Sequence, residues 1–169
     1  DGENPEQEHK TPRMSMDIAL PGRYVIHAPF ERANRISRRV REKAARARME
    51  KMLEMLDDFQ GCILRAAAIH TQTDVLIREA RILKAVWGQI QPHLEGAAPQ
   101  LVMLGPDAAQ RMLADSSGGG IDEIAVSSME AYHAVEEWCD LYAPDLVTRI
   151  APVQMKNVHG DLVLLSARD

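Results

Sequence analysis

The chain has 169 residues, of which 46% are hydrophobic, 27% are charged and 4% are aromatic, and its formal net charge is -5. This composition is ordinary for a soluble globular protein of one domain, and the length is sufficient to bury a core. It excludes a membrane-spanning helix, because no stretch approaches the ~18 consecutive apolar residues that a span requires. The scarcity of aromatic residues also argues against a groove of base-stacking side chains.

In chain order, residues 1–13 are rich in Pro, Glu and Asn, so we expect them to be disordered or loosely extended. Residues 13–20 and 23–28 alternate as strands do, with a turn at Pro21-Gly22 between them and a loop over 29–35 after them. Helices are predicted over about 40–56 and 73–91. Gly61 argues against one continuous helical hairpin, because the apolar run over about 62–67 is typical of a buried strand.

The second half alternates more regularly. Strands are predicted over residues 99–104, 121–127, 146–153 and 161–166. Helices are predicted over 107–115, opened by Asp107, and over 128–142, capped by Ser127 or Ser128. Strands that alternate with helices of about ten to fifteen residues indicate an α/β (α+β) fold, a sheet layered with helices.

The charge is unevenly distributed along the chain. Residues 31–52 contain nine Lys or Arg residues and three Glu residues, a local charge of +6, which leaves eleven basic and twenty-two acidic residues elsewhere. A basic stretch on an acidic body is typical of a surface that binds phosphates. It is also typical of a solvated helix face, which is the commoner case.

No short motif points to catalysis. Cys62 and Cys139 lie in separate apolar settings without a CxxC pair, which indicates two buried thiols in a reducing compartment, the cytoplasm or the matrix or stroma of an organelle. No phosphate-binding glycine loop, HExxH or GxSxG motif is present, and the acidic pairs lack a two-metal setting. The residues predict a binding or regulatory domain without a cofactor or metal.

Arg65 interrupts the predicted buried strand, since residues 61–68 read GCILRAAA. Its aliphatic stem could pack while the guanidinium reaches water. Alternatively, its charge is held at the end of the strand to receive an anion. The surroundings of Arg65 decide between these two interpretations.

Six stretches occur in a suggestive order, namely IALPGRYVIHAP, RISRRV, GCILRAAA, EARILKAVWGQIQ, GIDEIAVSSMEAYHAVEEW and DLVTRIAPVQ. Together they resemble the ribonuclease E/G family of endoribonucleases, in the segment that follows its oligonucleotide-binding barrel, from about Lys10 to the C-terminus. In that family this segment is the 5′ sensor, which recognises the 5′-monophosphate of an RNA and promotes cleavage elsewhere in the enzyme. The resemblance implies a 5′-sensor-like domain over residues 14–169, with residues 1–13 disordered or a remnant of the barrel.

The resemblance also implies which residues form the pocket. They are Gly22, Ile26, Arg38, Arg39, Arg65 and Ala66. Ala66 stands where the family pattern has threonine, so one hydroxyl donor is missing beside a guanidinium that suits a phosphate dianion. We expect this to weaken the pocket without abolishing it. The residues expected to contact the RNA backbone are Arg41, Lys43, Arg46 and Arg48.

We therefore expect an RNA-binding regulatory segment whose partners are RNA and the rest of a ribonuclease E/G-type enzyme. The family's metal-binding catalytic section has no counterpart in these residues, so this chain alone is expected not to cleave RNA. Two alternatives stay open. One is a non-catalytic subunit of a larger ribonucleoprotein, such as an organellar ribosome, and the other is a protein-interaction scaffold that binds no RNA.

Overall fold

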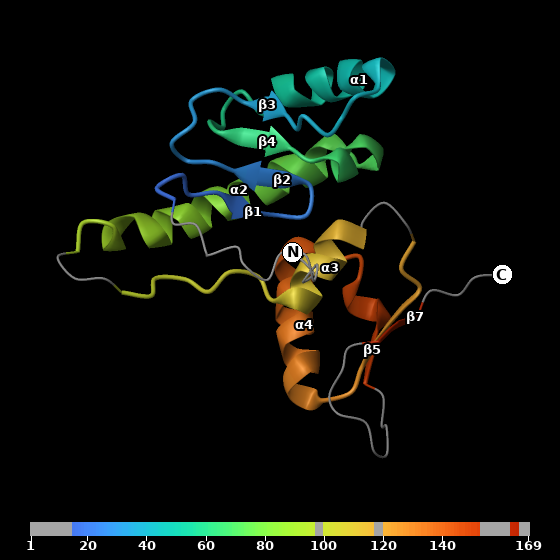
Figure 1. Ribbon diagram of the computed structural model, residues 1–169. Helices are drawn as coiled ribbons and strands as arrows, with labels where there is room; N and C mark the ends of the chain where they lie inside the picture. Colours follow the sequence, from blue (N-terminus) through green and yellow to red (C-terminus); the bar gives the residue numbers. More distant parts are fainter. Residues whose placement is uncertain (1–14, 97–99, 117–119, 153–162, 166–169) are drawn as a thin grey trace, which may run out of the picture.

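The computed structural model describes residues 15–96, 100–116, 120–152 and 163–165, the last range by its backbone alone. The predicted disordered stretch 1–13 lies outside the described residues. The chain forms two sheets, each with its own helices (Figure 1). The predicted α/β (α+β) class is confirmed, with two small mixed sheets in place of one layered sheet.

The first sheet has the strand order β1-β2-β4-β3. Its strands are β1 (Leu20–Pro21), β2 (Val25–His27), β3 (Arg35–Ile36) and β4 (Cys62–Leu64). β4 is fully buried between the antiparallel β2 and the parallel β3, which confirms the buried strand predicted after Gly61. It ends earlier than predicted, because a 3-10 helix (Ala66–His70) follows and buries Ala68.

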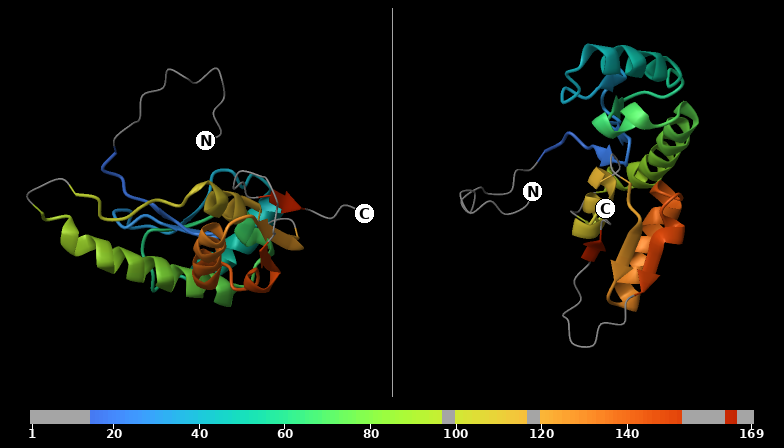
Figure 2. Two further views of the ribbon diagram at one scale, coloured as in Figure 1. Left: turned by 90° about the horizontal axis from the view of Figure 1, so that it is seen from below. Right: turned by 90° about the vertical axis from the view of Figure 1, so that its right-hand side faces the viewer.

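Two helices pack on this sheet. α1 (Lys43–Glu54) contacts β3, and α2 (Thr73–Ile90) lies across β2 and β1 (Figures 1 and 2). Their buried apolar residues recur at spacings of three, four or seven positions, as amphipathic helices require. These are Ala45, Met49 and Met52 in α1, and Leu76, Ala80, Leu83 and Ile90 in α2. Both helices lie close to their predicted bounds.

The second part has its own sheet and core, and lies below the first sheet in Figure 1. Its elements are α3 (Ala108–Asp115), β5 (Glu123–Val126), α4 (Met129–Tyr142), β6 (Ile150–Pro152) and β7 (Val163–Leu165). β5 is central, parallel to β6 and antiparallel to β7. Asp107 caps α3 in a capping box with Gln110, and Ser128 caps α4, which confirms both predictions.

Several predicted strands differ from the structure. No strand forms within residues 100–104, where Leu101 and Leu104 are 76% and 78% exposed. An apolar run becomes a strand only where a neighbouring strand pairs its backbone, and none lies beside this run within the described ranges. β6 starts at Ile150 because residues 147–149 form a 3-10 turn. β1 spans only two residues, and β3 begins at the end of the predicted loop.

Both cysteines are buried free thiols, as predicted. Burial raises the pKa of the Cys62 and Cys139 thiols to about 11 each, so they are neutral and poor nucleophiles near neutral pH. No helix in the described part of the chain is both long and apolar enough to span a bilayer.

His27, at the end of β2, predicts a pH dependence of stability. Burial and the nearby charge of Lys84 lower its pKa below the usual value of 6.5, against a backbone hydrogen bond at Gln60 that raises it. The unfolded chain therefore takes up this proton more readily, so the stability contributed by His27 is present above pH 6.5 and is lost as the pH falls through the folded pKa. We expect urea denaturation to show a smaller acid-induced loss of unfolding free energy in His27→Gln than in the wild type. An equal loss in both proteins would contradict this.

Candidate functional site

Three chain segments meet at one edge of the first sheet. β3 and β4 are parallel, so their carboxyl ends lie at the same edge, and the antiparallel β2 begins there. The Ser37 N–H donates to the Leu64 carbonyl at 2.9 Å, and the Arg65 N–H donates to the Tyr24 carbonyl at 2.8 Å. We call residues 22–24, 37–39 and 65–66 the sheet edge.

Five of the six predicted pocket residues lie at this sheet edge. They are Gly22, Arg38, Arg39, Arg65 and Ala66. The side chains of Arg38, Arg39 and Ala66 are exposed. Ile26 lies in the middle of β2, opposite Ile63, and is partly exposed one step away from the edge. Backbone pairing thus brings together the three segments that contain these five residues, and their role as a pocket stays a prediction.

The guanidinium of Arg65 contacts three other residues. Its Nη1 donates to the Gly22 carbonyl at 2.8 Å, with the Arg23 carbonyl at 3.4 Å. Its Nη2 forms an ion pair with the carboxylate of Asp115 in α3. The side chain is 22% exposed, so it does not simply extend into water. In this structure the charge at the end of β4 does receive an anion, and that anion is a carboxylate of the same chain.

The carbonyls of the hairpin turn face Arg65 because the amides of the same turn face the interior. One carboxylate oxygen of Glu79, in α2, accepts from the Arg23 N–H at 2.6 Å, and the other accepts from the N–H groups of Tyr24 at 2.8 Å and Val25 at 2.6 Å. Glu79 is only 2% exposed. Burial is the largest effect on the carboxyl group and raises its pKa above the usual value. The three amide donors and the charge of Arg23 oppose this rise.

Gly22 leaves room for this buried carboxylate. A Cβ atom at this position would lie 2.7 Å from Cδ of Glu79 and 2.8 Å from the Val25 carbonyl oxygen, inside van der Waals contact. The Gly22 N–H itself donates to that carbonyl at 2.8 Å. The four amides of residues 22–25 are thus all bonded within the protein. The turn therefore offers carbonyl oxygens, which bind cations such as Arg65 and do not bind phosphate directly.

A second ion pair joins the same turn to the second part. Arg23 is buried, and its Nη1 donates to Oδ1 of Asp145 at 2.7 Å. Its guanidinium lies 5.1 Å from the centre of the Tyr24 ring, and its Nε has no hydrogen-bond partner among the described residues. Arg78 in α2 also donates to the Asp140 carbonyl at 3.2 Å. Charged side chains therefore connect the two parts, from the sheet edge through Arg23 and from α2 through Arg78.

Sequence reasoning misses the three acidic residues that organise this edge, Glu79, Asp115 and Asp145. Glu79 leaves a readable signal, because helical spacing aligns it with Leu76 and Leu83 on the apolar face, where a carboxylate requires buried donors. Asp115 and Asp145 leave no signal, since they lie 50 and 122 residues from their arginine partners.

The basic stretch continues from the sheet edge into α1. Arg41, Lys43 and Arg48 are exposed, and the partly buried Arg46 donates to the Val40 carbonyl at 3.1 Å. The first turn of α1 contains no acidic residue, although the dipole already makes this end of the helix positive. Lys43 adds positive charge to this first turn, next to the negative charge of the N-cap residue Glu42.

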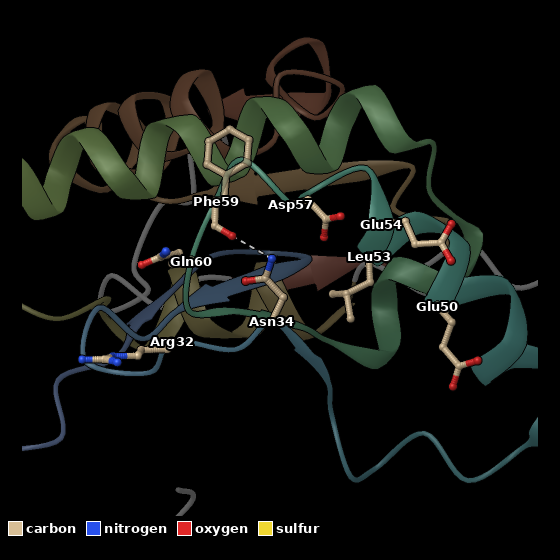
Figure 3. A pocket seen from close by; sticks show the side chains of 8 residues that line it. All are labelled: Arg32, Asn34, Glu50, Leu53, Glu54, Asp57, Phe59 and Gln60. Carbon is tan, nitrogen blue, oxygen red and sulfur yellow. Dashed lines mark hydrogen bonds between the residues drawn. The ribbon is translucent and has the colours of Figure 1, made fainter.

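A hollow of about 340 Å³ lies at the opposite end of the first sheet from the sheet edge (Figure 3). It is lined by Arg32, Asn34, Glu50, Leu53, Glu54, Asp57, Phe59 and Gln60. Three of these side chains are carboxylates and one is basic, so the hollow repels a phosphate. Asn34 fixes the chain there by donating to the carbonyls of Leu56 at 2.9 Å and Phe59 at 2.7 Å, and by accepting from the Cys62 N–H at 2.9 Å.

The described ranges contain no group of three or more His, Cys, Asp or Glu residues placed to hold a metal ion. The groups at the sheet edge are guanidinium groups, turn carbonyls and the carboxylates that pair with them. Such groups recognise charge, and the exposed arginines beside them are the donors that suit phosphate oxygens.

Comparison with known proteins identifies relatives of this chain. The model of the Ribonuclease E/G family matches residues 19–164. Ribonuclease G of Salmonella typhimurium (strain SL1344) and of Escherichia coli (strain K12) are each 30% identical to it over 143 residues, which cover 83% of this chain and 29% of each relative. Ribonuclease E of Nostoc sp. is 29% identical over 131 residues, covering 76% of this chain and 19% of that protein.

The chain thus spans less than a third of the length of these curated relatives. Within that span the match is continuous, from β1 into β7, and it includes every segment that meets at Arg65. This chain therefore belongs to the ribonuclease E/G family, as an RNA-related ribonuclease-family domain.

Proposed function

We propose that this chain is the 5′-sensor domain of a ribonuclease E/G-type enzyme, a non-catalytic segment that binds the 5′-monophosphate end of an RNA. Its partners are then the RNA and the remaining sections of the enzyme, in RNA processing or decay. The observation that carries the proposal is the pairing of β3 with β4, which places the chain segments of Arg38, Arg39 and Arg65 at one sheet edge.

The charges at this edge fit a terminal phosphate. A monophosphate carries about 1.5 to 2 negative charges and offers acceptor oxygens that match a guanidinium fork. Arg65 is anchored to the turn carbonyls on one side, which limits the freedom that its side chain must lose when it binds. Arg38 and Arg39 are exposed beside it, and the exposed cations before and in α1 are available for the phosphates that follow along the RNA.

The test compares two short single-stranded RNAs of one sequence, with a 5′ monophosphate or a 5′ hydroxyl, by fluorescence anisotropy. The wild type should bind the phosphorylated RNA more tightly, and Arg65→Ala should remove this preference. Loss of a charged hydrogen bond costs about 1.5–3 kcal/mol, so the preference at stake is roughly 10- to 150-fold. Ala66→Thr should increase the preference by roughly 2- to 10-fold, because it restores a hydroxyl donor.

Arg81→Ala is the matched control, because it removes an exposed arginine from α2, on an element that does not form the sheet edge. It should leave the preference for the phosphorylated RNA unchanged. Equal affinity of the wild type for the two RNAs would show that the domain does not sense the 5′ end.

A second candidate function is favoured by the exposed cations of residues 41–48. In a non-catalytic subunit of a ribonucleoprotein, these side chains would bind the RNA backbone, independently of the chemical group at the 5′ end. The affinity for RNA would then fall steeply as the salt concentration rises. Neutralising Arg41, Arg46 and Arg48 would lower the affinity for both RNAs equally. If neither RNA binds at low salt, the remaining hypothesis is that the chain is a protein-interaction scaffold.

A further inference from the structure

Asp115 is the last residue of α3, and its carboxylate accepts a hydrogen bond from Nη2 of Arg65. α3 belongs to the second part and lies at its upper end, toward the first sheet, in Figure 1. The side chain of Asp115 is 68% exposed, whereas that of Arg65 is 22% exposed. The Gly22 carbonyl therefore holds Arg65 from the protein side, and Asp115 covers it from the solvent side.

A phosphate that reaches Arg65 from solvent meets the side that Asp115 covers. Carboxylates and phosphates use the same N–H donors of a guanidinium, so the two anions compete. They also repel each other at short range, which disfavours binding of both at once. Departure of the Asp115 carboxylate thus favours binding of a phosphate at Arg65.

The pair is weak enough to exchange. Ion pairs with an exposed partner are weak, because water competes for both charges. A 5′ monophosphate carries about 1.5 to 2 negative charges, more than a carboxylate, and has Arg38 and Arg39 beside it. A 5′ hydroxyl carries no charge and does not displace Asp115.

We propose that Asp115 is a specificity-determining residue, which competes with the RNA 5′ phosphate for the guanidinium of Arg65 and so limits the preference for a phosphorylated end. This inference rests on the proposed function. Competition lowers the affinity for a phosphorylated RNA by the fraction of molecules in which Arg65 is already paired. It leaves the affinity for a 5′-hydroxyl RNA unchanged, because that RNA makes no use of Arg65.

The test is Asp115→Asn, which keeps the size of an exposed side chain and removes its charge. Affinity for the phosphorylated RNA should rise roughly 2- to 5-fold, the range that a surface pair of this strength allows. Affinity for the 5′-hydroxyl RNA should change no more than in Asp122→Asn. Asp122 is an exposed aspartate of the second part that forms no ion pair within the described ranges, so it reports the general effect of removing one negative charge.

Adding Asp115→Asn to Arg65→Ala should improve binding of the phosphorylated RNA by no more than Asp122→Asn improves it in the wild type, because Asp115 acts through Arg65. Three results would overturn the inference: weaker binding of the phosphorylated RNA by Asp115→Asn, an equal rise for both RNAs, or no change. Weaker binding would show that Asp115 positions Arg65.

Failure of the proposed function gives a different pattern, namely a wild type that does not distinguish the two RNAs. In that case a preference that arises only in Asp115→Asn would still support competition at Arg65. If Asp115→Asn also shows no preference for the phosphorylated RNA, this inference is overturned as well.

Discussion

Replacing Glu79 with alanine is expected to lower the free energy of unfolding by about 3–5 kcal/mol. The change leaves the buried N–H groups of Arg23, Tyr24 and Val25 without their acceptor, and each unsatisfied buried donor costs about 1–3 kcal/mol. It also removes a negative charge near the buried guanidinium of Arg23. Since domains are stable by only about 5–15 kcal/mol, urea denaturation followed by circular dichroism should detect the loss easily.

Two further variants make this result specific. Glu79→Gln keeps the size of the side chain but turns an amide nitrogen toward backbone donors, so it should lose stability as well, though less than alanine. Glu50→Ala removes an exposed glutamate from α1 and should change the unfolding free energy by no more than about 0.5 kcal/mol. A Glu79→Ala protein as stable as Glu50→Ala would contradict the role assigned to these three hydrogen bonds.

Gly61→Ala is expected to destabilise the protein by about 2–5 kcal/mol. Gly61 has a φ of +71°, in the left-handed region that costs other residues about 1–2 kcal/mol. A Cβ atom here would also lie 2.9 Å from the Ala28 carbonyl carbon and 2.9 Å from the Glu31 carbonyl oxygen. Both contacts are with backbone, which cannot move aside without disturbing the hydrogen bond of 2.8 Å from the Ala28 N–H to the Gly61 carbonyl.

Gly88→Ala is the matched control, since it makes the same chemical change inside α2, where a Cβ atom would meet nothing within 4 Å. Alanine is favoured over glycine in a helix by about 0.8–1.0 kcal/mol, so this variant should be more stable than the wild type. Thermal unfolding of the two variants should therefore shift in opposite directions. A shift in the same direction would show that the backbone conformation of Gly61 is not what requires glycine.

The helices of this protein could be predicted from sequence because each contains its own evidence. Leu76, Ala80 and Leu83 repeat at the helical period, and Asp107 and Ser128 supply local caps. Gly61 likewise divides α1 from α2 by a conformation that its own backbone adopts. Such signals depend on neighbours in the chain and need no knowledge of the tertiary structure.

The strands were harder to predict because a strand depends on a partner that may lie far away in sequence. Residues 100–104 have the apolar composition of a strand but no pairing strand in the described structure. Arg35, at the end of the predicted loop, instead pairs with β4 together with Ile36. The candidate site divides in the same way. Family resemblance locates Arg65 and Arg39, but the groups that hold Arg65 come from distant segments that only the fold brings together.

The ion pair between Arg23 and Asp145 has a consequence for the order in which the chain is synthesised. Domains begin to fold as they leave the ribosome, N-terminal segments first. The hairpin that contains Arg23 is made 122 residues before the carboxylate that neutralises it. Until that carboxylate emerges, Arg23 has Glu79 near it but lacks its ion pair with Asp145, so its guanidinium is only partly compensated. The sheet edge is thus expected to reach its final form only late in synthesis, after α4 has been made.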